Sequence, residues 1–236
     1  MPRSTQPNDS SLMRISDFER QHGVASGRGD AGATRLAALN PSLMQDLLRF
    51  EPDQKPGDAY DTLELLGVMA AALRHDRALL VHLLFDYRVI PVTVRPSERQ
   101  LLSPLSLGQL LDLRLPDLRV LRVEPAPPTP SPGLHAARLN PLLWELALRG
   151  SREALLPEIA GIAAYRVTPG ADLSALDLVG SLAAAVGRLR QQATSLREIA
   201  GWPGFDRGRA SRMLNGLYLQ AALMVTRTHP SAISNG

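Results

Sequence analysis

The chain has 236 residues and a net charge of +3, with 44% hydrophobic residues and only 4% aromatic residues. This length allows one large domain or two small ones, and the composition favours helices over a β-sandwich. Cysteine is absent, which excludes disulfides and thiolate chemistry. Neither a signal peptide nor a run of about 18 apolar residues is present, so we expect a cytoplasmic protein with no membrane contact.

The first 33 residues are rich in small and polar side chains and have few apolar anchors. We therefore expect residues 1–33 to form a disordered N-terminal segment. The stretch from Gly27 to Gly32 formally matches a dinucleotide-binding fingerprint, but no strand precedes it. It is interpreted as a flexible glycine run, and no cofactor is expected.

Residues 34–124 predict a small mixed α/β-sheet domain. Asn40 and Pro41 begin a short amphipathic helix, with asparagine as the cap and proline in the first turn. A broad apolar stretch after Ala59 predicts a mostly buried helix that ends at His75 and Asp76. The remaining elements are strands at 78–85, 89–94, 99–102 and 118–123, and a helix from Ser106 to Leu113. The pattern predicts a compact α+β unit with one sheet.

Five prolines mark residues 125–133 as a polyproline II linker between domains. Residues 134–229 then predict a mostly helical domain, and residues 230–236 a disordered tail. The expected elements are helices at 140–149 and 154–164, a strand at 165–168, and a long helix capped by Ser174 with Asp177. Val179, Leu182, Val186 and Leu189 form the core stripe of that long helix.

The stretch from Thr194 to Arg227 has the clearest local signals. Ser195 and Glu198 have capping-box spacing, and the residues Trp202-Pro203-Gly204 end the first short helix. Asp206 caps a second helix that extends to about Ala222. An apolar, β-branched run at 223–227 then predicts a strand.

This order of short helix, turn, longer helix and strand resembles the second half of a winged-helix or helix-turn-helix module, a superfamily best known from transcription regulators. A winged helix usually continues into a hairpin, but here the chain soon reaches His229 and Pro230. The strand at 223–227 therefore needs an upstream partner, and the predicted partner is Tyr165–Thr168.

A helical projection of residues 207–222 separates two faces. The predicted core face holds Ala210, Met213, Leu214, Leu217 and Ala221. The opposite face is the expected interaction face, and it holds Gly208, Arg209, Arg212, Asn215, Gly216 and Leu219. Arginine and asparagine suit the reading of bases in a major groove. An exposed leucine suits a protein partner instead.

Positive charge is concentrated in the last part of the chain. Residues 188–227 contain seven arginines and only two carboxylates, Glu198 and Asp206, for a local net charge of +5. Such a cluster favours a phosphate backbone or an acidic protein surface. However, 25 of the 26 basic residues in the chain are arginines, so general arginine preference also contributes.

The sequence contains no recognisable catalytic pattern. The five histidines are scattered, none of them in an i,i+4 pair, so no metal site is expected. No phosphate loop, nucleophile elbow or kinase signature occurs. We therefore do not expect an enzyme.

Three functional hypotheses follow. The first is a non-catalytic, bacterial-type regulatory or adaptor protein that binds a protein partner through its C-terminal module. The second is a DNA-binding transcription regulator that uses the helix at 207–222 and carries Arg209, Arg212 and Asn215 on its reading face. The third is that the first domain binds a small ligand or has an enzymatic activity. Each hypothesis is compatible with a homodimer.

Overall fold

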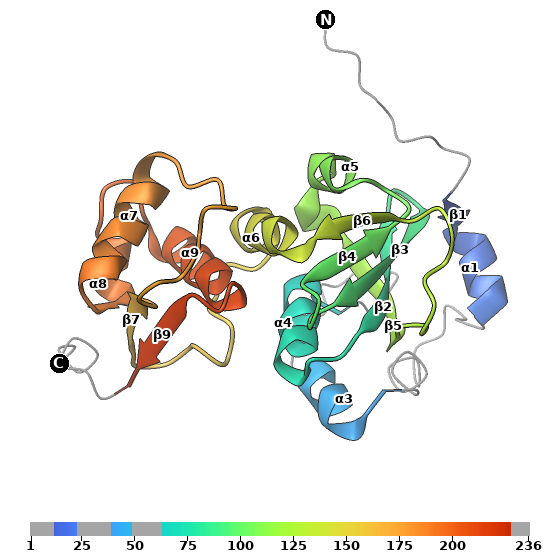
Figure 1. The fold of residues 1–236 in the computed structure, drawn as a ribbon, viewed down its shortest axis with the longest axis horizontal. Helices are drawn as coiled ribbons and strands as arrows, with labels where there is room; N and C mark the ends of the chain where they lie inside the picture. The colour runs from blue at the N-terminus through green and yellow to red at the C-terminus, as the bar shows by residue number, and fades with distance from the viewer. Residues whose placement is uncertain (1–11, 23–38, 49–62, 228–236) are drawn as a thin grey trace, which may run out of the picture. The chain divides into compact units, whose positions relative to one another are not determined.

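A computed structural model describes residues 12–22, 39–48 and 63–227 (Figure 1). The chain divides into two compact units, residues 1–139 and 140–236, and each is described by itself. Helices and antiparallel strands occur together, so the predicted α+β class is confirmed. Most of the expected segments 1–33 and 230–236 lie outside the described residues.

The first unit is built on one antiparallel sheet. Its main path has the order β5-β2-β3-β4-β6, and β1 pairs with β3. The strands are β1 (Met13–Arg14), β2 (Leu79–Phe85), β3 (Arg88–Arg95), β4 (Gln100–Ser103), β5 (Arg119–Pro125) and β6 (His135–Arg138).

A two-residue turn joins β2 to β3. Asp86 and Tyr87 both have positive φ angles, 46° and 60°. Two-residue turns of this kind match the right-handed twist of the flanking strands and fix the pairing register. The register places Val81 opposite Val92 and Leu83 opposite Ile90, and all four side chains are buried.

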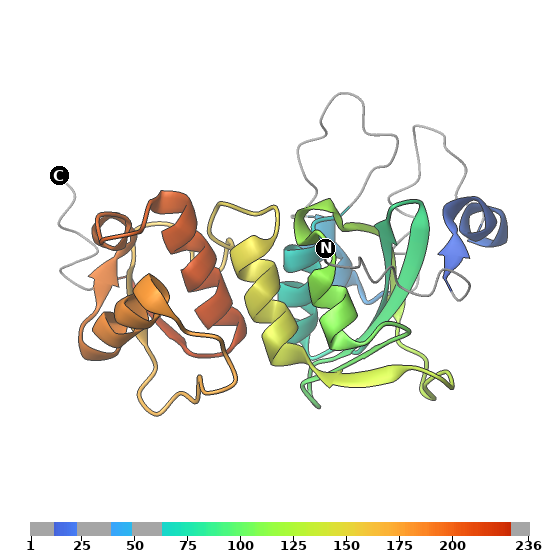
Figure 2. The same cartoon turned by 90° about the horizontal axis from the view of Figure 1, so that it is seen from above.

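Helices lie on both sides of this sheet. Figure 2 shows α4 (Leu65–His75) and α1 (Ile15–His22) on opposite sides of it. The short helix α3 (Pro41–Leu48) packs on α4, and α5 (Leu107–Asp112) and the 3-10 helix η1 (Leu115–Asp117) connect β4 to β5. From Leu65 to Ala72 every residue of α4 is buried, as its broad apolar surface predicts.

The segment 12–22 corrects the prediction of disorder over residues 1–33. Here the chain forms β1 and α1, and the side chains of Ile15 and Phe18 are buried against Val89 and Leu121. The two apolar residues are three positions apart, which places them on one face of a helix. The helix α1 is stabilised by packing on the sheet, so the polar composition of the segment did not predict it.

The helix caps in the first unit agree with the sequence. Asn40 Oδ1 accepts a hydrogen bond from the Ser42 backbone N–H at 2.9 Å, directly before α3. Ser106 and Gln109 form a full capping box at the start of α5. Each cap satisfies backbone donors that have no partner within the helix.

The residues after the proline-rich segment differ from expectation. His135–Arg138 was assigned to the helical domain that begins at residue 134, yet it forms β6 at the edge of the first sheet. Leu101 pairs with Ala137 there, and the Leu139 N–H donates to the Arg99 carbonyl at 2.8 Å. Backbone pairing with β4, which no local pattern encodes, accounts for this strand.

The second unit combines helices with a small antiparallel sheet of order β8-β7-β9. Tyr165 pairs with Val225, so the predicted pairing between the strands near 165 and 225 is confirmed. The elements are α6 (Leu139–Arg149), β7 (Ala164–Val167), α7 (Gly180–Gln191), β8 (Thr194–Ser195), α8 (Leu196–Ala200), α9 (Arg207–Leu219) and β9 (Leu223–Thr226).

The helix predicted over 154–164 is absent, because a side chain takes the place of helical hydrogen bonds. Asn215 Oδ1 accepts from the Leu156 N–H at 2.8 Å, and its Nδ2 donates to the Ala154 carbonyl at 3.0 Å. Pro157 and Gly161, whose φ is 96°, also disfavour a regular helix. The segment is a loop held against α9.

Two helices of this unit are shorter than predicted. The long helix begins at Gly180, because Ser174 is held in a turn by Asp172 and Val179 occupies the exposed cap position. The last helix stops at Leu219 and does not reach 222. Ala221 there has a φ of 56°, so it is exposed and does not extend the core face.

Candidate functional site

The turn between α8 and α9 is shaped by two capped helix starts. Ser195 and Glu198 form the predicted capping box of α8. Asp206 Oδ1 accepts from the Arg209 backbone N–H at 2.6 Å, as predicted for the start of α9. Both nearby carboxylates therefore have structural roles in which they accept backbone hydrogen bonds.

Two guanidinium groups lie over two aromatic rings at this turn. Arg188 Cζ, from α7, is 5.3 Å from the centre of the Trp202 ring. Arg209 Cζ is 5.3 Å from the centre of the Phe205 ring, and the two rings meet edge to face. Each exposed cation–π contact is worth about 0.5–1 kcal/mol, enough to orient a guanidinium but leave it hydrated.

We define the arginine–aromatic surface as Arg188, Trp202, Phe205, Arg207 and Arg209. The three arginines are exposed and the two rings are half-buried. Arg209 also donates to the Gly204 carbonyl at 2.8 Å. Within the described part of the chain, the Arg207 side chain makes no hydrogen bond or ion pair. The surface thus presents cations to solvent on a partly rigid support.

Only part of the predicted interaction face is exposed. Arg209 is exposed, as expected. Arg212 is partly buried, because its NH2 group pairs with Glu153 Oε1 at 2.9 Å and its Nε lies 3.4 Å from the Arg152 carbonyl. The Arg212 side chain is therefore held against the loop that precedes β7.

The rest of that face is inside the fold, which corrects the prediction. Asn215 is fully buried, Gly216 is buried, and the residue exposure of Leu219 is only 2%. A Cβ atom on Gly216 would lie 2.6 Å from Trp144 Cε3, so glycine is required for the close approach of α6 and α9. The missed partners, Trp144 and the loop at 154–156, are about 60 or more residues away in sequence.

The sequence interpretation missed the aromatic part of this surface. In the sequence, Trp202 marks the end of a helix and Arg188 belongs to the charged stretch, but no prediction included Phe205. A tryptophan and a phenylalanine in a turn flanked by arginines are unusual in a chain with 4% aromatic residues. That local contrast was the available signal.

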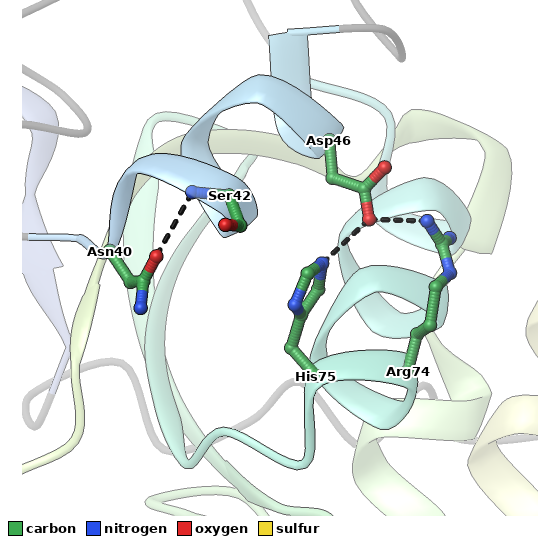
Figure 3. A network of polar contacts seen from close by, with 5 residues as sticks. All are labelled: Asn40, Ser42, Asp46, Arg74 and His75. Carbon is green, nitrogen blue, oxygen red and sulfur yellow. Dashed lines mark hydrogen bonds and ion pairs between the residues drawn. The ribbon is translucent and has the colours of Figure 1, made fainter.

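A second polar cluster lies in the first unit, between α3 and α4 (Figure 3). Asp46 of α3 is buried and forms an ion pair with Arg74 of α4. His75 Nε2 lies 2.7 Å from Asp46 Oδ2. One carboxylate is thus shared by two basic side chains, which ties α3 to α4.

A third cluster lies under α1 on the opposite side of the sheet. His82 Nε2 is 3.2 Å from Glu124 Oε2, and Arg122 Nε donates to Glu124 Oε1 at 2.6 Å. Burial lowers the pKa of His82 below its usual value, more than Glu124 raises it. Burial tends to raise the pKa of Glu124, but the hydrogen bonds from His82 and Arg122 outweigh it and lower that pKa. Neutral His82 beside ionised Glu124 is the favoured state.

The hypothesis of a ligand or an activity in the first unit gains no support at α4. The residues of that helix from Leu65 to Ala72 are apolar and buried, including Val68, Met69 and Ala72. In the residues that the structure describes, no group of three histidine, aspartate or glutamate side chains could hold a metal ion.

No helix of the described segments is long and apolar enough to span a bilayer. The chain matches no protein-family model, no curated protein and no solved structure. The basis for a functional proposal is therefore the geometry of the arginine–aromatic surface, in which exposed arginines lie over aromatic rings near the start of α9.

Proposed function

We propose that this is a regulatory protein whose second unit binds duplex DNA through the arginine–aromatic surface. The observation that carries the proposal is the pair of exposed guanidinium groups of Arg188 and Arg209 over the two rings of the turn, with Arg207 also exposed at the start of α9. Among helix-turn-helix proteins, the N-terminal residues of the second helix approach the DNA.

The charges around the turn support a polyanionic partner. Two carboxylates lie beside the first turn of α9: Asp206 is bonded to the backbone of α9, and Glu153 is paired with Arg212. The N-terminal end of a helix adds a partial positive charge in the same place. The exposed arginines and the N-terminal end of α9 both attract phosphate groups.

The burial of Leu219 is the reason for placing DNA ahead of a protein partner at this helix. A buried leucine offers no apolar area to a partner, so the main support for protein contact at α9 is lost. The arginines of the surface remain exposed, and they favour phosphate.

The test is fluorescence anisotropy with a labelled duplex at fixed low salt. The double variant Arg207→Ala/Arg209→Ala is expected to bind roughly 10- to 100-fold more weakly, since two phosphate contacts are removed. Arg114→Ala, which removes an exposed arginine of the first unit, is the matched control and should bind as the parent protein does. Equal affinity of the double variant and the control would contradict the proposal.

A second candidate, an adaptor that binds protein, has its own observation. In the second unit Ile162, Val179 and Met224 are 70%, 62% and 45% exposed. Large exposed apolar side chains can contribute to protein association. Light scattering would test the homodimer form of this role: Val179→Asp and Met224→Asp should abolish any dimer, and a protein that is monomeric at high concentration would exclude it.

A further inference from the structure

We infer that the arginine–aromatic surface holds the phosphate backbone of DNA and does not read its base sequence. This inference rests on the proposed function and specifies the kind of DNA recognition that this chain can perform. Sequence-specific reading requires side chains that reach base edges, typically three or four from the helix in the major groove.

Asn215 is unavailable for base reading. Its amide oxygen accepts from Leu156 N–H and its amide nitrogen donates to the Ala154 carbonyl, so both halves of the amide are bonded inside the fold. Pairing with adenine needs the same two groups at once. Asn215 therefore fixes the loop at 154–156 and cannot also contact a base.

Arg212 is held in a similar way. Its NH2 group pairs with Glu153 and its Nε faces the Arg152 carbonyl, on the side of α9 where that loop lies. A bidentate contact with guanine would require both interactions to break. The loop itself also occupies the space next to the middle of α9.

The last part of α9 is closed as well. Gly216 packs directly on Trp144, and Leu217 and Leu219 are buried. The exposed arginines of α9 are therefore confined to its first turn, at Arg207 and Arg209. One helical turn can contact phosphates, but it cannot lie along a major groove with several side chains on base edges.

The aromatic rings fit the same conclusion. Trp202 and Phe205 are half-buried beneath guanidinium groups, so they orient cations and do not present bare ring faces for base stacking. Cations on a rigid support are suited to the regularly spaced charges of a duplex backbone.

The experiment is selection from a pool of duplexes with randomised sequence, followed by anisotropy over a salt series. The selected pool should contain no enriched motif and should bind within about twofold of the starting pool, whereas a sequence-specific protein gains several powers of ten. The slope of log affinity against log salt should become shallower by about 1 for each of Arg207→Ala and Arg209→Ala.

The variant Glu153→Gln provides a second readout. It removes a negative charge next to α9 and releases Arg212, so it should strengthen binding by about threefold without creating a sequence preference. An enriched motif that binds more than about tenfold tighter than the starting pool would overturn the inference but leave DNA binding intact. Failure of every pool to bind at low salt would overturn the proposed function as well.

Discussion

The Asp46 cluster of the first unit and the arginine–aromatic surface of the second unit use charged side chains in opposite ways. In the first unit, Asp46 is buried and balanced by Arg74 and His75, and it serves to join two helices. In the second unit, Arg188, Arg207 and Arg209 are exposed around one turn, where the carboxylate of Asp206 is used as a helix cap. The charges of the first cluster are paired with each other, whereas the exposed arginines of the second are available to bind an anion.

The difference shows why residue type alone was a poor guide to the site. Arg212 and Asn215 have the right chemistry for base contact, but both are already bonded within the protein. Arg212 pairs with Glu153, and the Asn215 amide is bonded to the loop backbone. Arg207 and Arg209 have the same chemistry without such partners in the interior. Burial and pairing, more than identity, separate structural from interacting groups.

Removal of Asn215 should have the largest effect. Asn215→Ala leaves the buried Leu156 N–H without a partner and removes one of the two donors to the Ala154 carbonyl, so we expect a loss of about 3 kcal/mol in the free energy of unfolding. Urea denaturation followed by tryptophan fluorescence would measure it. Ser181→Ala, at a half-buried position of the same unit with no side-chain hydrogen bond within the described residues, is the control. A stable Asn215→Ala protein with reduced sequence preference would instead indicate a base-reading role.

The Asp46 cluster should respond next. Asp46→Ala removes the only carboxylate that Figure 3 shows between Arg74 and His75, and should cost about 2 kcal/mol, less than a fully buried pair because both partners are about a quarter exposed. Thermal unfolding by circular dichroism gives the measurement. DNA affinity should not change, and a large change would contradict the separation of the two clusters.

The cluster under α1 predicts a pH dependence of smaller size. His82 has a pKa below its ordinary value of 6.5, so on acidification the unfolded chain binds a proton before the folded chain does. The first unit should therefore lose stability as the pH falls below 6.5. Glu124, whose pKa is lowered from 4.5, should cause a second loss when it is protonated at still lower pH.

Melting temperatures measured from neutral to acidic pH would test this sign. His82→Gln should flatten the first step, while His135→Gln, a change at an exposed position, should leave it unaltered. Stability that rises between pH 6.5 and 5 in the parent protein would be inconsistent with a buried neutral His82.

The aromatic support should give the smallest effect. Trp202→Ala leaves the three arginines in place but removes the ring beneath Arg188, so DNA affinity should fall by only about threefold, the equivalent of about 0.7 kcal/mol. Tyr87→Ala, which removes an exposed aromatic side chain of the first unit, is the control. No loss of affinity would show that Arg188 does not need the ring.

Short-range signals allowed much of the fold to be predicted. Asn40, Ser106, Ser195 and Asp206 all cap helices as their positions suggest, because a cap depends on residues only two or three positions away. The pairing of β7 with β9 was also foreseen, since a lone strand needs a partner and few candidates were available.

Most of the errors arise from contacts distant in sequence, whereas the later start of α7 and the earlier end of α9 have local causes. Leu219 looks exposed on a helical projection of α9 alone, and nothing in its neighbours encodes the burial that the rest of the fold gives it. The loop at 154–156 depends on Asn215, and β6 depends on β4. Such pairings require the tertiary structure, and the exposed face of α9 could not be derived without them.

The central position of β7 affects how the second unit can assemble. Both of its neighbours in the sheet, β8 and β9, follow it in the chain, and Val167 is separated from Leu223 by a long intervening segment that must fold back first. During synthesis, β7 appears before either partner, and its edge toward β9 has no partner strand until Leu223–Thr226 has been made. The sheet of the second unit should therefore be completed only after α7, α8 and α9 have been synthesised, which makes β9 the last strand that this unit needs.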